Sequence, residues 1–472
     1  MKVLLIAPSF DPIGQGHGSK RRKGTRYGFW ASYTAALLSG IIKKMGHQFE
    51  YIDAPMLMWS NAEIVRRIAE ARPDIIGISA VLALKDSVIE LARAIRAQAK
   101  VDAPIFLGGL LATSFGERVL SENPEIDYAV VGEAEETIQE LLKKIEAGES
   151  MEGVRGIIYR NGPGIVRNPD RPPIKDLDSL PSPDWSIFDL KMYRPIPFQN
   201  KRLPIIPYMA SRGCSYSLCT FCYESAPFAP PWRRHSPQRV VRDIQEAVER
   251  YGVREVAFFD DIFLINERWV LEFCGLLREK KIDIAWSCLA YAKSMTKKMV
   301  EAAAKAGCWS IYLGFESANQ ETLDRIKKGL SMEQVRAAIG WMHEYRVDIR
   351  GSFILSLPGE SPEKAMNSVR FAVENDLTYV LFLPYFPEYG TPLYNEVAAN
   401  EVVVDEYKGR ANAQYVPPGY KDEAEVMRTI RKAYQKFYLR PAYVWKHLKR
   451  IRTPDDVRHY YEALHFVTGL SS

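Results

Sequence analysis

Short, continuously apolar runs alternate with longer amphipathic stretches over the first 150 residues. The runs lack the polar alternation of a half-exposed strand, which is typical of strands buried on both faces. We expect strands at residues 3–7, 48–53, 74–80, 105–108 and 128–132. We expect helices between them at residues 33–44, 62–71, 86–97, 116–122 and 136–146. Strict alternation with short connections predicts an α/β domain with a doubly wound parallel sheet of the Rossmann or flavodoxin type.

A second alternating series begins near residue 200. The expected strands are 203–210, 255–260, 284–289, 310–315, 348–356 and 379–386. The expected helices are 237–251, 267–280, 297–306, 332–345 and 362–374. Six strands separated by helices predict a partial (β/α)6 barrel, in which ligands meet the carboxyl ends of the strands.

Prolines and a change of pattern divide the chain into four parts. Six prolines fall within residues 163–183, which indicates a linker between domains. We therefore expect the doubly wound domain at 1–150, a linker at 151–197, the barrel at 198–395 and a helical carboxyl-terminal extension at 396–472.

Composition is that of a globular protein: 47% of the 472 residues are apolar and 26% are charged. The apolar runs are far shorter than the roughly 20 residues of a membrane helix, so we expect no transmembrane segment. The run after Met1 is too short for a signal peptide. Six cysteines in so long a chain argue against a secreted disulfide scaffold. We expect a cytoplasmic, reducing setting.

The net charge of +5 is mild, although basic residues gather at 20–23 and again at 440–452. Solvated loop and helix faces explain such clusters. Nucleic-acid binding usually needs a higher net charge or a recognisable binding module, and the sequence has neither. We expect no nucleic-acid partner.

Three cysteines follow the first barrel strand closely. Cys214, Cys219 and Cys222 have four and then two residues between them. Three thiolates on one loop can bind three irons of a 4Fe–4S cluster and leave the fourth iron open to a small molecule. The alternatives are a structural zinc loop or buried free thiols. Zinc sites normally need four ligands in two pairs, and this sequence has no second pair.

The cysteine loop resembles the signature of radical S-adenosyl-L-methionine (SAM) enzymes. The preceding Arg212-Gly213 and the aromatic Phe221 also fit that family. In the family, SAM fills the open iron site through its amino and carboxylate groups. The usual spacing is three residues and then two, so the longer first gap here requires a bulge. The resemblance assigns Phe221 to the cofactor site.

Two further strand ends resemble the same family. Asp260 and Asp261 match a paired aspartate whose carboxylates could accept hydrogen bonds from the SAM ammonium or the substrate. The alternative is a helix N-cap with a loop salt bridge. Glu316 and Ser317 match the G-x-E-S motif, which implies that the Glu316 carboxylate accepts hydrogen bonds from the SAM ribose hydroxyls. Residues 357–360 match the P-G-E turn after the fifth barrel strand.

The first 150 residues resemble the cobalamin-binding domain that begins many radical SAM proteins. The matching residues lie at the carboxyl ends of predicted strands: Ser79, Gly108, Gly109, Thr113, Gly132 and Glu133. The Asp-x-His-x-x-Gly loop whose histidine ligates cobalt elsewhere is absent, and His17 lacks that context. The resemblance therefore implies cobalamin without a protein histidine on cobalt. The alternative is a flavodoxin-like domain that has lost its cofactor.

The remaining cysteines and the carboxyl terminus carry weaker signals. Cys274, Cys288 and Cys308 fit a buried core better than a second cluster, because free cysteine often packs as a small hydrophobe. The aromatic and basic segment 434–443 contains an F-Y-L-R-P string that also occurs in cobalamin-type radical SAM proteins. It could close the barrel mouth and select the substrate, or it could be a purely structural cap.

The resemblance implies an enzyme with three cofactors: a 4Fe–4S cluster, SAM and cobalamin. In the family, the reduced cluster cleaves SAM to a 5′-deoxyadenosyl radical, which abstracts hydrogen from the substrate. We expect methylation of an unactivated carbon in a small-molecule or lipid substrate. The alternatives are ring formation, ring contraction or carbon-skeleton rearrangement of a lipid, tetrapyrrole or secondary metabolite, and a non-catalytic cobalamin or redox sensor. The expected electron donor is reduced flavodoxin or ferredoxin, and no residue is assigned as catalytic.

Overall fold

The structure is a computed structural model that describes residues 1–9, 28–196, 198–226, 229–400 and 415–449, with the single residues 451, 457 and 461; for 398–400 it describes the backbone only. The chain divides into two compact units, one beginning at Met1 and ending at Tyr193, and one beginning at Arg194. His17 and the basic cluster at 20–23 lie outside the described residues.

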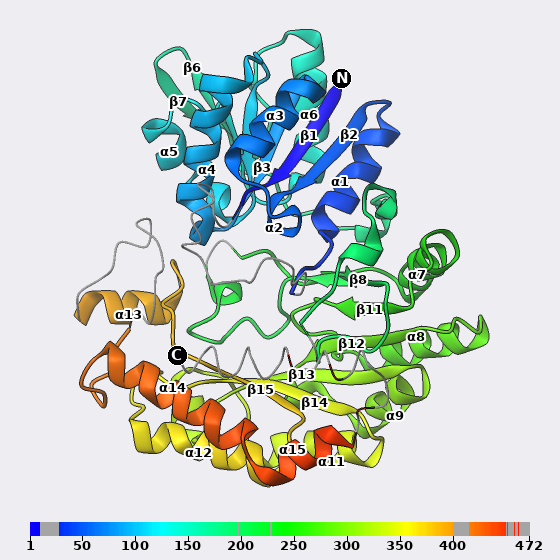
Figure 1. The fold of residues 1–472 in the computed structure, drawn as a ribbon, viewed down its shortest axis with the longest axis vertical. Coiled ribbons are helices and arrows are strands. Elements are labelled where there is room, and N and C mark those ends of the chain that lie inside the picture. Colours follow the sequence, from blue (N-terminus) through cyan, green and yellow to red (C-terminus); the bar gives the residue numbers. More distant parts are fainter. Residues whose placement is uncertain are drawn as a thin grey trace. The chain divides into compact units, whose positions relative to one another are not determined.

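The first unit is built on a seven-stranded sheet with the order β2-β1-β3-β4-β5-β6-β7 (Figure 1). The strands are β1 (Lys2–Ala7), β2 (Gln48–Asp53), β3 (Ile75–Ser79), β4 (Ile105–Gly108), β5 (Tyr128–Val130), β6 (Ile157–Asn161) and β7 (Gly164–Arg167). The first five pair in parallel, while β6 and β7 add antiparallel strands at one edge. The order of the parallel strands is that of a flavodoxin-like sheet, so the predicted fold class is confirmed.

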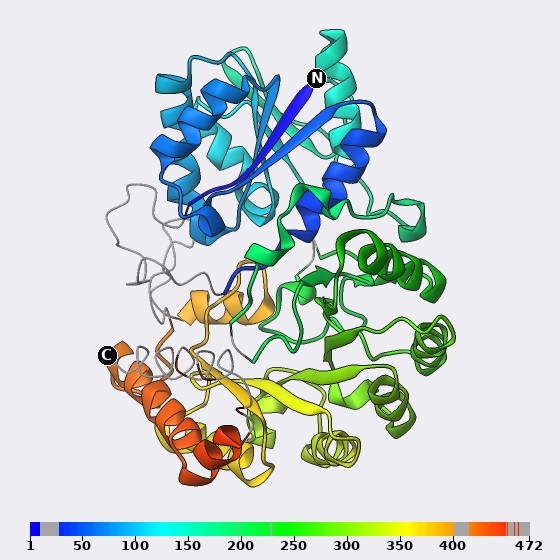
Figure 2. The same ribbon diagram turned by 45° about the vertical axis from the view of Figure 1, so that its right-hand side comes forward.

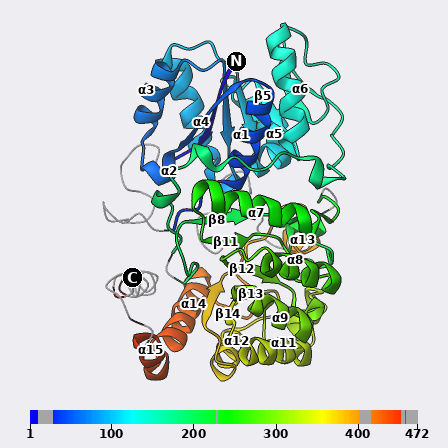
Figure 3. The same ribbon diagram turned by 90° about the vertical axis from the view of Figure 1, so that its right-hand side faces the viewer.

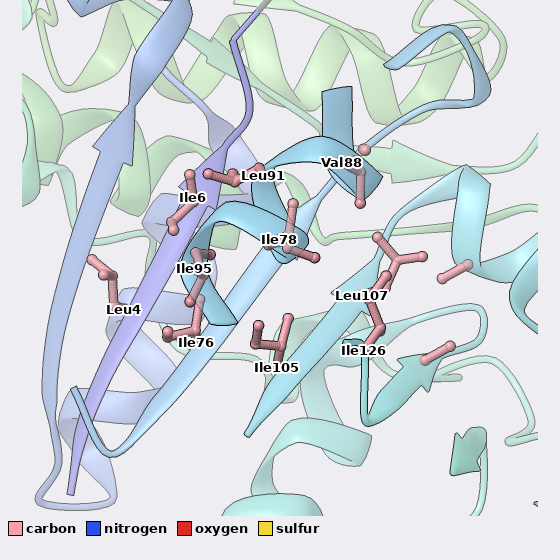
Figure 4. Packing of buried hydrophobic residues seen from close by; sticks show 14 of the residues in the cluster. Leu4, Ile6, Ile76, Ile78, Val88, Leu91, Ile95, Ile105, Leu107 and Ile126 are labelled. Atoms are coloured by element: carbon pink, nitrogen blue, oxygen red, sulfur yellow. The ribbon is translucent and has the colours of Figure 1, made fainter. Parts of the chain in front are cut away.

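Helices cover both faces of this sheet (Figure 2). They are α1 (Tyr33–Lys44), α2 (Ala54–Leu57), α3 (Asn61–Ala71), α4 (Lys85–Ala94, continued by a π turn over Ile95–Ala99), α5 (Leu110–Glu122) and α6 (Ala134–Ala147). Leu4, Ile6, Ile76 and Ile78 pack on one face against α3 and α4 (Figure 4). Val3 and Leu5 point to the other face, which α1 and α6 cover. Burial on both faces explains why these strands are apolar throughout.

Residues 151–193 fold against the first unit. Strands β6 and β7 extend its sheet, and Asp184 accepts hydrogen bonds from Ser39 Oγ at 2.8 Å and Lys43 Nζ at 2.6 Å. Tyr193 donates to Asp53 Oδ2 at 3.1 Å. Much of the segment expected as a linker is therefore part of this unit. Prolines are typical both of linkers between domains and of turns within a folded segment, so the sequence does not distinguish the two.

The second unit contains six parallel strands in the order β15-β14-β13-β12-β11-β8. They are β8 (Ile205–Tyr208), β11 (Glu255–Phe258), β12 (Ala285–Ala290), β13 (Cys308–Glu316), β14 (Asp348–Ile354) and β15 (Tyr379–Leu383). Their helices follow one another along the outside of the sheet (Figure 3). They are α7 (Pro237–Tyr251), α8 (Glu267–Glu279), α9 (Lys297–Lys305), α10 (Gln320–Arg325), α11 (Met332–Glu344) and α12 (Pro362–Glu374). The predicted partial barrel is confirmed.

Within the described residues after β15, three further helices follow: α13 (Pro392–Asn400), α14 (Glu423–Tyr438) and α15 (Pro441–Leu448). Tyrosines of this region bind the backbone of β15, the strand at the open edge of the barrel. Tyr438 Oη accepts from Val380 N at 2.9 Å and donates to Val380 O at 2.8 Å. Tyr434 Oη accepts from Phe382 N at 3.2 Å. Unpaired strand edges invite aggregation, and here the phenol groups satisfy part of that edge.

The three cysteines outside the loop lie in the barrel core. Cys274, Cys288 and Cys308 are 2%, 0% and 5% exposed. Across the residues that the structure describes, no group of three or more His, Cys, Asp or Glu side chains is arranged to hold a single metal ion. No helix within the described ranges has the length and apolar character needed to cross a membrane.

Candidate functional site

The cysteine loop begins at the carboxyl end of β8. Two very short strands, β9 (Ser211–Arg212) and β10 (Arg233–Arg234), pair antiparallel and close the base of the loop. His235 N donates to Ala210 O at 2.8 Å and extends this clasp. The sequence prediction that the three cysteines follow the first barrel strand agrees with this placement, which is where (β/α) barrels carry their chemistry.

Two residues with positive φ shape the loop. Gly213 has φ 77°, and a Cβ there would lie 2.7 Å from Pro230 O, so only glycine fits. Ser217 has φ 46°, and its hydroxyl donates to Cys214 O. A left-handed residue between Cys214 and Cys219 shortens the path of the chain. This is how the loop accommodates its fourth intervening residue.

The three thiols share one electrostatic environment. Cys219 is 9% exposed, and Cys214 and Cys222 are half-buried. Burial raises the pKa of Cys219 to about 11 and that of Cys222 to about 12, and each thiol senses the charge of a neighbouring loop cysteine. The thiols do not converge on one point, as ligands of a single ion must. Ligands of a cluster each bind a different iron, so convergence is not required of them.

A buried lysine supplies positive charge beside the loop. Lys328 is 9% exposed, and its Nζ lies 2.9 Å from Glu316 Oε1. The Nζ also lies 5.7 Å from the centre of the Phe221 ring and 5.9 Å from that of Tyr291. Burial acts to lower the pKa of Lys328, but the charges of Glu316 and Cys219 outweigh it and raise the pKa to about 12. The lysine is therefore a fixed cation next to three potential thiolates.

Glu316 ends β13 in a strained conformation. Its φ is 61°, which is unusual for a residue other than glycine. Gly314 makes room for it, because a Cβ at that position would lie 2.4 Å from Glu316 Oε1 and 3.2 Å from Lys328 Nζ. Such strain persists only where the surroundings hold it, and it often marks a functional position.

The hydroxyl of Ser317 serves the protein itself. It donates to Glu360 Oε1 at 2.8 Å and accepts from Asn319 N at 3.1 Å. Thr322 also donates to that Glu360 oxygen at 2.8 Å. The G-x-E-S segment and the P-G-E turn are thus joined by a buried polar network. Within it Ser317 positions the end of β13.

The two neighbouring aspartates differ in exposure. Asp260 is 1% exposed and accepts hydrogen bonds from Ala210 N at 3.0 Å and Ser211 Oγ at 2.6 Å. Burial raises its pKa to about 7, against those hydrogen bonds. Asp261 is exposed as a residue, although the protein around its carboxyl group partly removes it from water and raises its pKa. Asp260 therefore ties the start of the cysteine loop to β11, whereas Asp261 is accessible to a ligand. The alternative interpretation of the pair as a helix N-cap is wrong, because the N-cap of the following helix α8 is Asn266.

Glu224 is a further carboxyl group in this loop. It accepts a hydrogen bond from Cys214 N at 3.2 Å. Burial and the nearby charge of Asp261 raise its pKa to about 7, although Arg233 acts in the opposite direction. The backbone of the first cysteine is thus fixed by a side chain from the same loop.

In the first unit, the carboxyl ends of β3, β4 and β5 expose backbone rather than charge. Gly109 has φ 86°, and a Cβ there would lie 2.6 Å from Ala80 O. A Cβ on Gly108 or Gly132 would meet no other atom within 4 Å. Thr113 Oγ1 links the two loops, since it donates to Gly109 O at 3.2 Å and accepts from Gly132 N at 3.1 Å.

Two other predicted residues lie at this edge. Ser79 ends β3 and is half-buried. Glu133 precedes α6, and its Oε2 accepts from Ile174 N at 2.8 Å, so it fastens the segment after β7 to the sheet. The structure thus brings the six predicted residues of this unit to one edge, with Glu133 in a structural contact.

Sequence reasoning missed Lys328 and Glu224. Lys328 stands twelve residues after Glu316 in a segment rich in lysine, where a charge usually indicates a solvated surface. Only the short helix α10 between them folds it back into the core. The glycine at 329, where a Cβ would lie 2.0 Å from Tyr216 Oη, is the one local signal of close packing.

Two family models match the chain. The model of the radical SAM superfamily matches residues 208–372, and that of the B12-binding domain matches residues 22–142. Together these segments span more than half of the 472 residues. They also coincide with the barrel and with the first sheet.

Curated relatives extend over nearly the whole chain. An uncharacterized methyltransferase of Pyrococcus horikoshii is 28% identical over 445 residues, which is 93% of each chain. An anaerobic magnesium-protoporphyrin IX monomethyl ester cyclase of Cereibacter sphaeroides is 29% identical over 459 residues, 94% of this chain and 72% of that one.

The solved structure of the cobalamin-dependent SAM radical enzyme OxsB, with aqua-cobalamin and SAM bound, has a TM-score of 0.74 to this chain at 18% identity. The match covers 98% of this chain and 70% of OxsB, and it shows that the fold is shared. The radical SAM domain implies SAM and a 4Fe–4S cluster, and the B12-binding domain implies cobalamin. This chain is a member of the radical SAM superfamily, in the group of enzymes that carry a B12-binding domain.

Proposed function

We propose that this enzyme methylates an unactivated carbon of a small-molecule or lipid substrate. The observation that carries the proposal is the union, in one chain, of a three-cysteine barrel loop with a B12-binding sheet. When bound, the cluster with SAM supplies hydrogen abstraction and cobalamin supplies a transferable methyl group. The relative from Pyrococcus horikoshii, which matches over 93% of its own length, is named a methyltransferase.

We assign the cluster to Cys214, Cys219 and Cys222. The donor set fits a 4Fe–4S cluster, because three thiols of one loop lie in a shared environment and a fourth is missing. Lys328 offsets part of the negative charge that three thiolates bring into a buried site. Phe221, beside the Lys328 ammonium, forms one wall of this site.

We assign Glu316 and Asp261 to SAM. Lys328 engages one oxygen of Glu316, and a carboxylate retains further lone pairs for ribose hydroxyls. Asp261 is the exposed member of the aspartate pair and would face the SAM ammonium or the substrate. Asp260 and Ser317 have positioning roles, because their oxygens are engaged within the protein.

We assign cobalamin to the carboxyl edge of the first sheet. Gly108 and Gly132 leave space for a bulky ligand to approach the backbone, and Thr113 fixes the loops that carry them. Ser79 lies at the same edge at the end of β3. Glu133 shapes the edge by holding the following segment. Reduced flavodoxin or ferredoxin is the proposed source of electrons for the cluster.

Ring formation is the second candidate function. The similarity to a magnesium-protoporphyrin ester cyclase, 29% identical over 94% of this chain, favours it. The cofactor set of the two reactions is the same, so the residues of the site do not separate them. A non-catalytic sensor would leave the strained Glu316 without a purpose.

The test uses protein purified anaerobically with hydroxocobalamin, reduced, and mixed with SAM. Methylation predicts S-adenosylhomocysteine, formed as the corrinoid takes up a methyl group, together with 5′-deoxyadenosine. Formation of 5′-deoxyadenosine alone, with cobalamin bound, would contradict methylation and favour the ring-forming reaction. Absence of both products would contradict the radical SAM assignment of the cysteine loop.

A further inference from the structure

Arg350 is an unpartnered cation inside the barrel. It lies on β14, where strand pairing places it opposite Tyr312 on β13 and Tyr379 on β15. Its side chain is mostly buried, and its Nε is inaccessible and without a hydrogen-bond partner. Within the described part of the chain, the structure contains no hydrogen bond or ion pair to this guanidinium; it lies over the Trp309 ring, with Cζ 5.6 Å from the centre of the ring.

Alternation along the strands shows that Arg350 faces the inside of the barrel. Phe315 and Phe353 contact Phe371 of α12, and Phe382 contacts Phe437 of α14, so these residues form the outer face. Successive strand residues point to opposite faces. Arg350, Tyr312 and Leu381 therefore belong to the inner face.

The carboxylate whose charge acts on Arg350 is already engaged. Glu255, at the start of β11, accepts hydrogen bonds from Trp309 Nε1 at 2.8 Å and Lys201 N at 2.6 Å, and a third from Arg202 N. Asp348, two residues before Arg350 on β14, accepts a hydrogen bond from Thr378 Oγ1 at 3.5 Å. The Trp309 ring attracts the guanidinium but accepts none of its N–H groups as a carboxylate would. A buried guanidinium without a hydrogen-bond acceptor destabilises the protein, and a bound ligand that supplies an acceptor relieves this cost.

A second unpartnered polar group lies on the same inner face. Ser310 is fully buried at the start of β13, and its Oγ has no hydrogen-bond partner. Strand register places it two residues before Tyr312, the residue opposite Arg350. One cation and one hydroxyl two residues apart in strand register on the same face suit a planar monoanion, since a guanidinium binds a carboxylate through two parallel hydrogen bonds.

Apolar side chains line part of the inner face above this level, where Ser352 is a buried polar neighbour two residues after Arg350. Phe259 and Leu383, which follow β11 and end β15, are 41% and 38% exposed. Leu381 and Tyr312 are half-buried. Glu316, the proposed SAM ligand, lies four residues beyond Tyr312 on the same strand, which is about 13 Å along the strand. The inner face thus has a cation at its base, apolar walls, and the proposed radical chemistry at its rim.

We propose that Arg350 binds a carboxylate of the substrate, and that the substrate class is an otherwise apolar carboxylic acid; this rests on the proposed function. The acid enters the barrel with its carboxylate first. Its apolar body lies against Phe259, Leu381 and Leu383, which leaves a carbon remote from the carboxylate near Glu316 and the cysteine loop. Arg350 is a specificity-determining residue and takes no part in electron transfer.

The experiment measures binding of decanoate, decanol and decyl phosphate to the enzyme loaded with its cofactors, by anaerobic titration calorimetry. We expect decanoate to bind and Arg350→Gln to weaken it about tenfold or more, with decanol unaffected. Arg350→Lys should restore part of the affinity. Arg370→Gln, which alters an exposed arginine on α12, is the matched control and should bind decanoate as the wild type does.

Several titration results would overturn the proposal. They include equal decanoate binding by the wild type and Arg350→Gln, no probe binding more tightly to the wild type than to that variant, and Arg350-dependent binding of decyl phosphate that is tighter than that of decanoate. Parallel loss of decanoate and decanol binding would assign Arg350 a structural role and equally contradict it. Failure of the wild type to cleave SAM would contradict the proposed function, and that assay is independent of the decanoate titration.

Discussion

The ligand-facing edges of the two units are made of different groups. At the carboxyl edge of the first sheet, Gly108, Gly109 and Gly132 expose backbone, and the one polar side chain that links the loops is Thr113. At the carboxyl edge of the barrel, Lys328 and Glu316 form a buried ion pair beside three thiols. The first edge admits a bulky ligand by leaving space, whereas the second holds charge in place. The two edges should therefore fail in different ways when mutated.

The largest expected effect is loss of the thiolate ligands. Cys219→Ala should reduce 5′-deoxyadenosine formation to the level of an enzyme-free control, because an iron loses its protein ligand. Cys274→Ala, at a buried cysteine of α8, is the matched control and should retain the activity once folded. Chromatographic quantification of 5′-deoxyadenosine decides the matter. Equal activity in the two variants would contradict the cluster assignment.

Removal of the buried cation should have the next largest effect. Lys328→Met leaves Glu316 buried without its partner and should lower the free energy of unfolding of the protein by about 3–5 kcal/mol. Lys327→Met changes an exposed neighbour and should alter it by about 0.5 kcal/mol or less. Denaturant unfolding of both variants measures the difference. Similar free energies of unfolding for Lys328→Met and Lys327→Met would show that the Lys328–Glu316 ion pair does not stabilise the fold.

The base of the barrel should make stability depend on pH. Burial raises the pKa of Glu255 from 4.5 to about 7, against its hydrogen bonds from Arg202 and Lys201. A carboxyl group with a raised folded-state pKa stabilises the protein fully below about pH 4.5, and this contribution is lost as the pH rises through about 7. Its full size is about 3 kcal/mol.

Unfolding of the wild type and Glu255→Gln at pH 5 and pH 8 tests this. The variant does not titrate at this position, so the stability advantage of the wild type should shrink as the pH rises. An advantage that grows with pH would contradict a raised pKa, and with it the account of a barrel interior that shields its charges from water.

At the carboxyl edge of the first sheet, the neighbouring residues Gly108 and Gly109 offer a matched pair of variants. Gly109→Ala should lower the free energy of unfolding by about 2 kcal/mol, because φ is 86° and Ala80 O lies 2.6 Å from the added Cβ. Gly108→Ala should leave stability within about 0.5 kcal/mol, since nothing lies within 4 Å. Cobalamin retention should nevertheless fall in Gly108→Ala. Unchanged retention would mean that the ligand does not approach Gly108.

The smallest expected effect concerns β15, the last strand of the barrel sheet. Tyr438→Phe removes two hydrogen bonds to Val380 and should destabilise the protein by about 1–2 kcal/mol. Tyr434→Phe removes one, from Phe382 N, and should cost about half as much. Thermal unfolding compares the two. The reverse order would indicate that packing of the rings, rather than their hydroxyl groups, covers β15.

The sequence predicted the regular elements well where local signals and burial agree. Helix α7 begins after Ser236 with Pro237 and ends at Gly252, and its predicted bounds match. Continuous apolar runs identified the parallel strands of both sheets, but not the antiparallel strands β6 and β7. The prediction was poorer at α5, which begins at Leu110 and contains a kink at Phe115, where the pattern indicated a start at residue 116.

Tertiary contacts decided the rest. Apart from Gly329, nothing local shows that a lysine twelve residues beyond Glu316 returns to the core. Nor does anything local show that Tyr438 of α14 binds the backbone of a strand 58 residues away along the chain. Strand β6 joins the sheet by pairing with β5, and β7 joins it by pairing with β6. The cysteine triplet predicted a site because its chemistry lies within one loop. Asp260 and Asp261 look equivalent in sequence, and only the fold buries one and exposes the other.

The central claim is that one chain binds a 4Fe–4S cluster at the carboxyl edge of the barrel and cobalamin at the carboxyl edge of the first sheet. The most direct test measures iron and cobalamin per chain in the same anaerobic preparations of the wild type, Cys219→Ala and Gly108→Phe. The account predicts that Cys219→Ala loses the cluster iron and keeps cobalamin, while Gly108→Phe loses cobalamin and keeps the iron. Loss of both groups in either folded variant, or of neither, would contradict it.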